Sequence, residues 1–138
     1  MITEKKQIII LIENENDDKF GGYINNIIYK INDTQELDTK SFHFHLQSNN
    51  KFQQSMKFEM NDIEKNYLIF STSYGNRIIR FGDITLIKED MKHFSYWQQN
   101  NNHFNYHNNN INVSCEGIIN EFGRKCFIPK RIHVIQMI

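Results

Sequence analysis

The chain has 138 residues, with sixteen Lys and Arg balanced by sixteen Asp and Glu, and therefore no formal net charge. This length fits one domain that can bury a core without disulfides. The balanced charge argues against a nucleic-acid-binding protein, which needs a basic face. Two cysteines are too few for a secreted disulfide scaffold, and a single proline argues against a disordered linker.

The beginning of the chain gives no targeting signal. Its first apolar run is short and is broken by Glu13, unlike the core of a secretory signal peptide. No apolar run approaches the roughly 20 residues of a membrane-spanning helix. We therefore expect a cytoplasmic protein without a membrane span.

The first predicted element is a β-hairpin. Ile8–Ile12 is an apolar, mostly β-branched run that suits a strand buried on both faces. Glu13–Lys19 is a polar turn, and Tyr23–Ile28 continues the second strand. The turn carries four acidic side chains but lacks the ligand spacing of a calcium loop, so we expect a solvated turn. Asn32–Lys40 consists of turn formers and charges and predicts a loop.

The sequence Phe20-Gly21-Gly22-Tyr23 leads into that second strand. Each glycine costs about 0.5–1 kcal/mol in a regular strand. Paired glycines between two aromatic residues therefore indicate a bulge, a positive φ or a neighbour too close for a Cβ. We expect both glycines to be structural, because alanine at Gly21 or Gly22 should strain the backbone or collide with a neighbouring strand.

Ser41–Leu46 alternates with the period of two that is typical of a half-buried strand. One face carries Phe42, Phe44 and Leu46, and the other carries Ser41, His43 and His45. The two histidines would lie about 6–7 Å apart, within reach of one metal ion. A zinc site needs three or four ligands, and no companion ligand has a suitable spacing. We therefore expect histidines that face solvent.

Further strands are predicted at Phe52–Met60, Tyr67–Ser73 and Ile78–Lys88, the last broken at Gly82-Asp83. We expect Gly82 and Asp83 to shape a bend in which the Asp83 carboxylate accepts backbone N–H bonds.

The rest of the chain is more varied. The stretch from His93 to Asn112 is rich in Asn, Gln and aromatic residues, and we interpret residues 98–112 as a surface loop. Ser114–Gly123 predicts a short helix, and Arg131–Ile138 predicts a terminal strand. Residues 1–138 are therefore expected to form one mainly β domain, a two-layer antiparallel β-sandwich with one or two short flanking helices.

The order of these motifs resembles the TLDc domain family, which includes oxidation-resistance proteins. The resemblance covers roughly Gln7 to Met137 and depends most on the apolar strand followed by Phe20–Tyr23. It departs from the family in three places. The opening part of the family domain is absent, the Gly-rich segment is reduced to Phe81-Gly82-Asp83, and His133 stands where an acidic residue is usual.

The resemblance implies a β-sandwich without an agreed catalytic centre, a link to oxidative-stress protection and, in several relatives, binding to the V-type proton ATPase. We therefore expect a non-catalytic protein-interaction module without catalytic residues, metal or cofactor. One alternative is a redox-related enzyme that uses Cys115 or Cys126. The simpler interpretation is that both thiols are buried and act as small hydrophobic residues. Another is a nucleic-acid-binding regulator, favoured only by the aromatic residues of Phe94–Tyr106.

Overall fold

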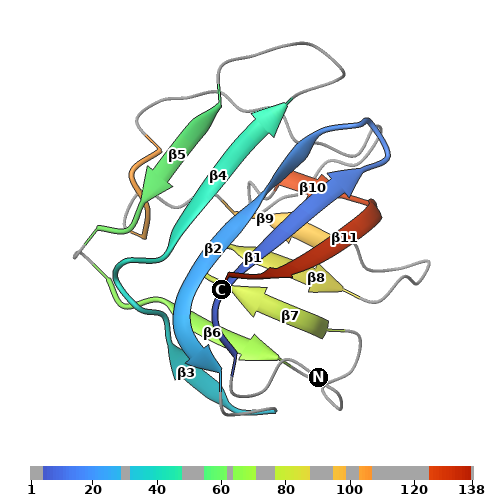
Figure 1. Cartoon of the computed structure of the whole chain (residues 1–138). Helices are drawn as coiled ribbons and strands as arrows, with labels where there is room; N and C mark the ends of the chain where they lie inside the picture. The colour runs from blue at the N-terminus through green and yellow to red at the C-terminus, as the bar shows by residue number, and fades with distance from the viewer. Residues whose placement is uncertain are drawn as a thin grey trace.

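The computed structural model describes residues 5–28, 32–47, 55–61, 64–70, 77–87, 95–98, 103–106 and 125–137. Within these residues all regular structure is β-strand, and the strands form two antiparallel sheets (Figure 1). The predicted two-layer β-sandwich is confirmed. The helix predicted at Ser114–Gly123 lies outside the described residues.

The five-stranded sheet contains the predicted hairpin and the terminal strand. Its order is β11 (Pro129–Gln136), β1 (Lys5–Asn14), β2 (Lys19–Ile28), β4 (Phe42–Gln47) and β5 (Met56–Glu59). The six-stranded sheet lies behind it in Figure 1. Its order is β10 (Lys125–Phe127), β9 (Ser95–Trp97), β8 (Ile84–Ile87), β7 (Arg77–Phe81), β6 (Tyr67–Phe70) and β3 (Thr34–Glu36).

The chain changes sheets at Ile128, between β10 and β11. The carbonyl of Ile128 accepts a hydrogen bond from the backbone N–H of Glu15 at 3.1 Å. The N–H of Ile128 donates to the Glu15 carboxylate at 2.7 Å. The acidic turn between β1 and β2 therefore anchors this crossing.

Two short strands lie where the sequence predicted none. β3 lies inside the predicted loop Asn32–Lys40, and β9 lies inside the Asn-rich stretch that follows His93. In the predicted surface loop of residues 98–112, Phe104 and Tyr106 are buried. The prediction of a surface position is wrong for these two side chains, because the Asn-rich composition hides aromatic side chains spaced two residues apart, which suits an extended segment with one face inward.

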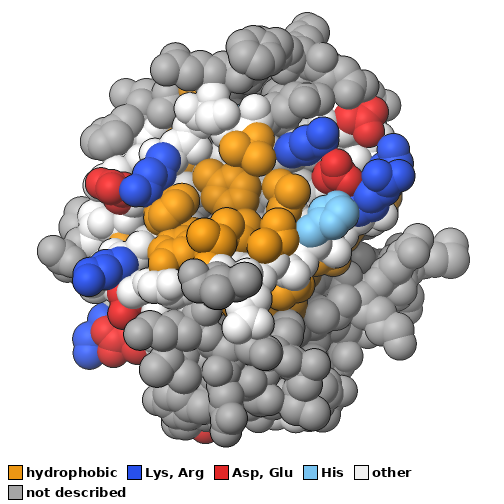
Figure 2. Space-filling model, viewed as in Figure 1, with side chains coloured by type: hydrophobic (Ala, Val, Ile, Leu, Met, Phe, Trp, Pro, Cys, Tyr) orange, Lys and Arg blue, Asp and Glu red, His pale blue; other side chains and the backbone are white. Residues whose placement is uncertain are grey.

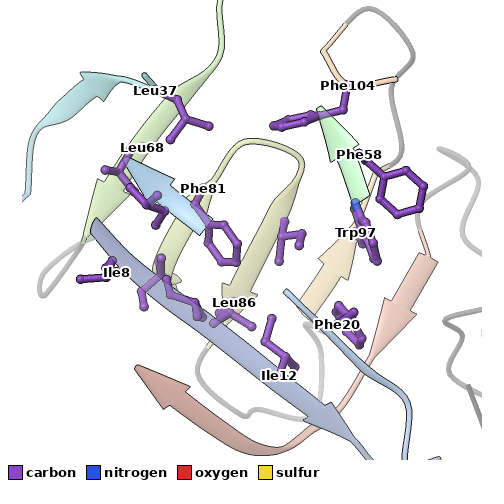
Figure 3. Close-up of a cluster of buried hydrophobic side chains, with 14 of the residues drawn as sticks. Ile8, Ile12, Phe20, Leu37, Phe58, Leu68, Phe81, Leu86, Trp97 and Phe104 are labelled. Carbon is purple, nitrogen blue, oxygen red and sulfur yellow. The ribbon is translucent and has the colours of Figure 1, made fainter. Parts of the chain in front are cut away.

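The core lies between the two sheets (Figure 3). Ile8, Ile10 and Ile12 of β1 point into it and are at most 1% exposed. Full burial of such a side chain stabilises the fold by about 1.5–3 kcal/mol. Ile9 and Leu11 are only partly buried. The prediction that β1 is buried on both faces is wrong, because the six-stranded sheet packs against one face only.

β4 shows the predicted alternation, but with the opposite face inward. His43 and His45 are each 1% exposed and point into the core. Phe42 and Phe44 are half-buried on the outside, and Leu46 is 39% exposed. The prediction of solvent-facing histidines is therefore wrong.

The surroundings of His43 explain this inversion. Its ring stacks on Phe104 with centroids 4.0 Å apart, and it meets Phe81 and Trp97 edge to face. Because an imidazole is smaller than a phenyl ring and can accept a hydrogen bond, it suits a site that is already crowded by aromatic rings and contains a backbone donor.

Candidate functional site

The double glycine of Phe20–Tyr23 allows close contacts on both faces of β2. Gly21 points outward, and a Cβ there would overlap the carbonyl oxygen of Ile10 in β1. Gly22 points inward, and a Cβ there would lie 2.6 Å from a ring carbon of Phe81. The motif thus fits one glycine against a neighbouring backbone and the other against the opposite sheet.

The Phe81-Gly82-Asp83 turn connects β7 and β8 and contacts the inward face of β4. Gly82 has a φ of 61°, and a Cβ there would lie 2.7 Å from Nε2 of His43. The N–H of Gly82 donates to the carbonyl of Tyr67 at 2.9 Å. The N–H of Asp83 donates to Nε2 of His43 at 3.1 Å. The predicted bend is therefore also a contact between the two sheets.

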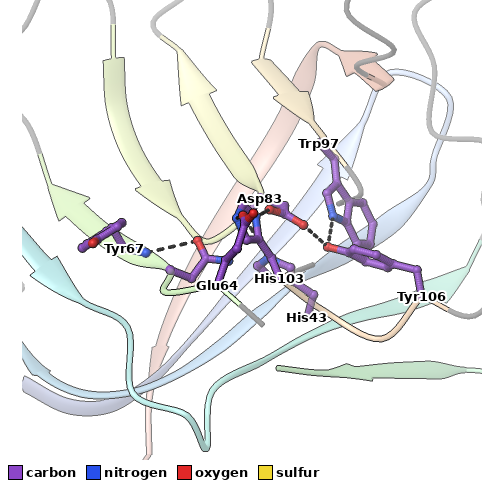
Figure 4. A network of polar contacts seen from close by, with 8 residues as sticks. His43, Glu64, Tyr67, Asp83, Trp97, His103 and Tyr106 are labelled. Atoms are coloured by element: carbon purple, nitrogen blue, oxygen red, sulfur yellow. Dashed lines mark hydrogen bonds and ion pairs between the residues drawn. The ribbon is translucent and has the colours of Figure 1, made fainter. Parts of the chain in front are cut away.

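A chain of polar contacts runs through the Asp83 carboxylate (Figure 4). Oδ1 of Asp83 lies 2.6 Å from Nδ1 of His103. The other oxygen, Oδ2, accepts a hydrogen bond from the Tyr106 hydroxyl at 2.7 Å. That hydroxyl accepts one from Nε1 of Trp97 at 3.1 Å. At the outer end, Nε2 of His103 lies 2.9 Å from the half-exposed carboxylate of Glu64.

Burial keeps two titratable members of this region neutral. Burial, with the nearby Asp83 carboxylate, raises the pKa of Tyr106 well above its usual value of 10. Burial, with a smaller effect of the His103 charge, lowers the pKa of His43 to about 3. A general acid or base works best with a pKa near the working pH. Neither side chain is suited to proton transfer at neutral pH.

His45 lies next to this region on the same face of β4. Burial lowers its pKa, and the nearby Asp18 carboxylate opposes that shift. Both of its ring nitrogens are buried without a hydrogen-bond partner in the described part of the structure. In the same part, no group of three or more His, Cys, Asp or Glu side chains is placed to bind a metal ion.

Of the remaining sequence candidates, Cys126 and the acidic turn take part in the packing of the described residues. Cys126 in β10 is a buried thiol, and Cys115 lies outside the described residues. The acidic turn is not fully solvated as predicted, because Asn14 and Asp18 are buried and hydrogen-bonded to each other at 2.8 Å. Lys130 pairs with Asp17 of this turn at 3.2 Å.

The outward face of the five-stranded sheet carries an apolar surface built from cross-strand rows. One row runs across four strands through Ile135, Ile9, Tyr23 and Phe42. The next runs through Leu11, Gly21 and Phe44. We define the outer apolar face by the side chains Ile9, Leu11, Tyr23, Phe42, Phe44, Leu46 and Ile135. Figure 2 shows hydrophobic side chains gathered over the middle of this side of the molecule.

Charged residues border the outer apolar face. Glu13 lies 3.7 Å from Lys19 and 3.9 Å from Arg131, in the row beyond Leu11. At the other side, Lys57 lies 3.3 Å from Glu59 and 4.3 Å from the centre of the Phe42 ring. The pair of Lys57 and Glu59, exposed on both sides, adds about 0–1 kcal/mol to stability. An apolar centre with a charged border is the anatomy of many protein–protein interfaces.

Sequence reasoning missed both of these features. The outer apolar face was missed because Phe42, Phe44 and Leu46 were assigned to the inward side of β4. The contacts of Asp83 with His103 and Tyr106 join positions 20 and 23 residues apart. The only sequence signal for them was the aromatic spacing of Phe104 and Tyr106 within the Asn-rich stretch.

No protein-family model matches this sequence, and neither a curated protein nor a solved structure resembles it closely enough to be matched. The likeness to the TLDc family therefore depends on the ordered motifs of this chain alone. In the part of the chain that the structure describes, no helix is long and apolar enough to cross a lipid bilayer.

Proposed function

We propose that this domain is a non-catalytic protein-interaction module of the TLDc type, which binds a partner protein in the cytoplasm through the outer apolar face. The V-type proton ATPase is the partner that the family resemblance suggests, with a role in protection against oxidative damage. The observation that carries the proposal is the outer apolar face itself.

The exposure of this face supports a binding role. Leu46 and Ile135 are 39% and 45% exposed, and the aromatic side chains between them are half-buried. The Tyr23 and Phe42 rings lie 5.0 Å apart, so they offer a continuous surface rather than scattered side chains. Monomeric soluble proteins rarely expose large contiguous apolar patches, and apolar patches with a polar border often mark interaction sites.

The polar network supports a non-catalytic role. The Asp83 carboxylate is bound on one oxygen by His103 and on the other by Tyr106. The Tyr106 hydroxyl is occupied both as donor and as acceptor. Networks satisfied in this way fix the relative positions of the elements that they join. Here they attach residues 103–106 to the β7–β8 turn and to the core.

The test is a binding assay between purified V-type proton ATPase and residues 1–138. We expect Leu46→Lys to weaken binding by at least about tenfold, equivalent to about 1.4 kcal/mol. Tyr67→Lys is the matched control, because Tyr67 is a large apolar residue with 42% exposure on the other sheet, and it should bind like the parent. Absence of binding by the parent would refute the assignment of this partner. Equal affinities of the parent and Leu46→Lys would refute the assignment of this face.

A further inference from the structure

The four edges of the two described sheets differ greatly in length. β3 and β10, the edges of the six-stranded sheet, have three residues each, and β5 has four. β11 has eight residues. Short edge strands limit pairing with other chains, whereas long ones expose a row of backbone donors and acceptors.

The β5 edge is also covered. Met60, next to β5, forms an isolated bridge with Phe104. The N–H of Asn105 donates to the carbonyl of Glu59 at 2.8 Å, and the N–H of Asn61 donates to the carbonyl of His103 at 3.1 Å. The segment attached through Asp83 therefore lies along this edge. β11 is the long edge strand that no described segment covers.

The pairing of β11 with β1 determines which backbone groups point outward. The N–H of Met137 donates to the carbonyl of Gln7 at 2.8 Å, and Ile135 lies opposite Ile9. In an antiparallel pair, alternate residues bond to the neighbouring strand and the others point away. The N–H groups of Ile132, Val134 and Gln136, which lie in the regular part of this pairing, are therefore directed away from β1.

The side chains of β11 are exposed on both faces. Ile132 and Val134 are 39% and 45% exposed on one face, and Ile135 and Met137 are 45% and 43% exposed on the other. Proline and lysine, which protect edges against pairing, occur only at Pro129 and Lys130. The second half of the strand, His133–Gln136, contains no proline or lysine.

We propose that β11 pairs with the β11 strand of a second copy in antiparallel orientation, so that two five-stranded sheets form one continuous sheet across a two-fold axis. Such an interface uses the same surface of both copies. It provides each outward N–H and carbonyl with a partner, and it covers Ile132 and Val134 with the same residues of the other copy.

The charge distribution favours the antiparallel direction for pairing with a second copy. Lys130 and Arg131 stand at the start of β11, and the residues from Ile135 to Met137 are uncharged. Antiparallel self-pairing places the basic end of each strand against the uncharged end of the other, whereas parallel pairing would align like charges. The zero formal net charge of the chain also favours self-association.

Sedimentation equilibrium of residues 1–138 over a wide concentration range tests the proposal. We expect a dimer with twice the 16.6 kDa monomer mass. Val134→Pro removes an N–H that points away from β1, a place where an edge strand tolerates proline. It should raise the dimer dissociation constant by at least about tenfold. Val134→Lys should have the same effect through charge and gives a second test if the proline variant does not fold.

The control is Ile135→Pro, which removes an N–H directed at β1 and should destabilise the monomer itself. Leu46→Lys should leave the dimer intact. Val134→Pro should still bind the partner of the outer apolar face if that face functions as proposed. The failure of one proposal can therefore be told apart from the failure of the other. A monomer at all concentrations would overturn the proposed dimer. A dimer unaffected by both Val134 variants would overturn the assignment of β11.

Discussion

Nε2 of His43 accepts a hydrogen bond from the backbone N–H of Asp83 at 3.1 Å, across forty residues of sequence. This contact joins β4 in one sheet to the β7–β8 turn of the other. Because Nε2 accepts, the single proton of the neutral imidazole is on Nδ1. Protonation of Nε2 would replace the acceptor with a donor that faces another donor, so His43 must stay neutral for the two sheets to remain joined here.

This contact predicts a loss of stability in acid. His43 titrates at its usual 6.5 in the unfolded chain and at about 3 when folded. Below pH 6.5 the unfolded state therefore binds the extra proton, and the free energy of unfolding falls as pH is lowered toward 3. The loss attributable to His43 is about 4–5 kcal/mol over that range. His45, whose pKa is also lowered, adds to the loss in the same direction.

Denaturation with urea at a series of pH values measures this loss. Nitrogen-15 NMR of the imidazoles supplies the control, since it should show His43 neutral and protonated on Nδ1 at pH 5. A His43 signal that titrates near pH 6.5 in the folded protein would contradict the prediction.

The Asp83 carboxylate should contribute more to stability than its exposed neighbour Glu64. Asp83→Asn keeps the size of the side chain but removes the charge beside His103 and gives the Tyr106 hydroxyl a weaker acceptor to donate to. We expect a loss of about 2–4 kcal/mol in the free energy of unfolding, because one partner of a buried charged contact is removed. Glu64→Gln is the matched control. Glu64 is 50% exposed, so its loss should be at most about 1 kcal/mol. Equal losses in the two variants would show that the network is not centred on Asp83.

The β-sandwich was predictable because its strongest signals are local. The apolar run of β1, the polar turn and the alternation of β4 each identify a strand from a few neighbouring residues. Which face of β4 points into the core was not predictable in this way. A shift of one residue in the register of a strand turns every side chain to the opposite face. Here the inward face of β4 depends on Phe81, Trp97 and Phe104, which are distant in sequence.

The Asp83 network was not predictable from sequence for a related reason. Asp83 was singled out as a turn residue, and that turn exists. Its carboxylate contacts depend on His103 and Tyr106, which lie in a segment whose composition predicts a surface loop. Only the burial of Phe104 and Tyr106 in the folded chain shows that this segment packs against the core.

Cys126 should behave as a buried hydrophobic residue. It is 7% exposed in β10 and belongs to the core cluster. A thiol reagent should therefore modify it in the native protein at least about 100 times more slowly than in urea, because modification requires local opening. Mass spectrometry of the Cys115→Ser variant isolates the reaction of Cys126. Rapid native modification would instead support the redox-related enzyme.

Trp97 is the single tryptophan and is fully buried, so it reports on the core. Its ring stacks on Phe20 with centroids 5.3 Å apart, and its Nε1 donates to Tyr106. We expect fluorescence emission characteristic of an apolar site and little quenching by acrylamide. Tyr106→Phe should shift this emission and cost about 1–3 kcal/mol, since it leaves the buried indole N–H and one Asp83 oxygen without this partner. Emission typical of exposed tryptophan in the parent would contradict the burial of β9.

The two glycines of the Phe20–Tyr23 motif should differ in their tolerance of alanine. At Gly21 the added methyl would meet the Ile10 carbonyl, a backbone atom held in the β1–β2 ladder. At Gly22 it would meet the Phe81 ring at 2.6 Å, and a side chain can shift at a cost of about 1–3 kcal/mol. We therefore expect Gly21→Ala to be the more destabilising change, with Ser55→Ala at an exposed position as the control. Urea midpoints rank the three variants. If Gly21→Ala has the same urea midpoint as the parent, Gly21 is not required for the close approach of β1 and β2.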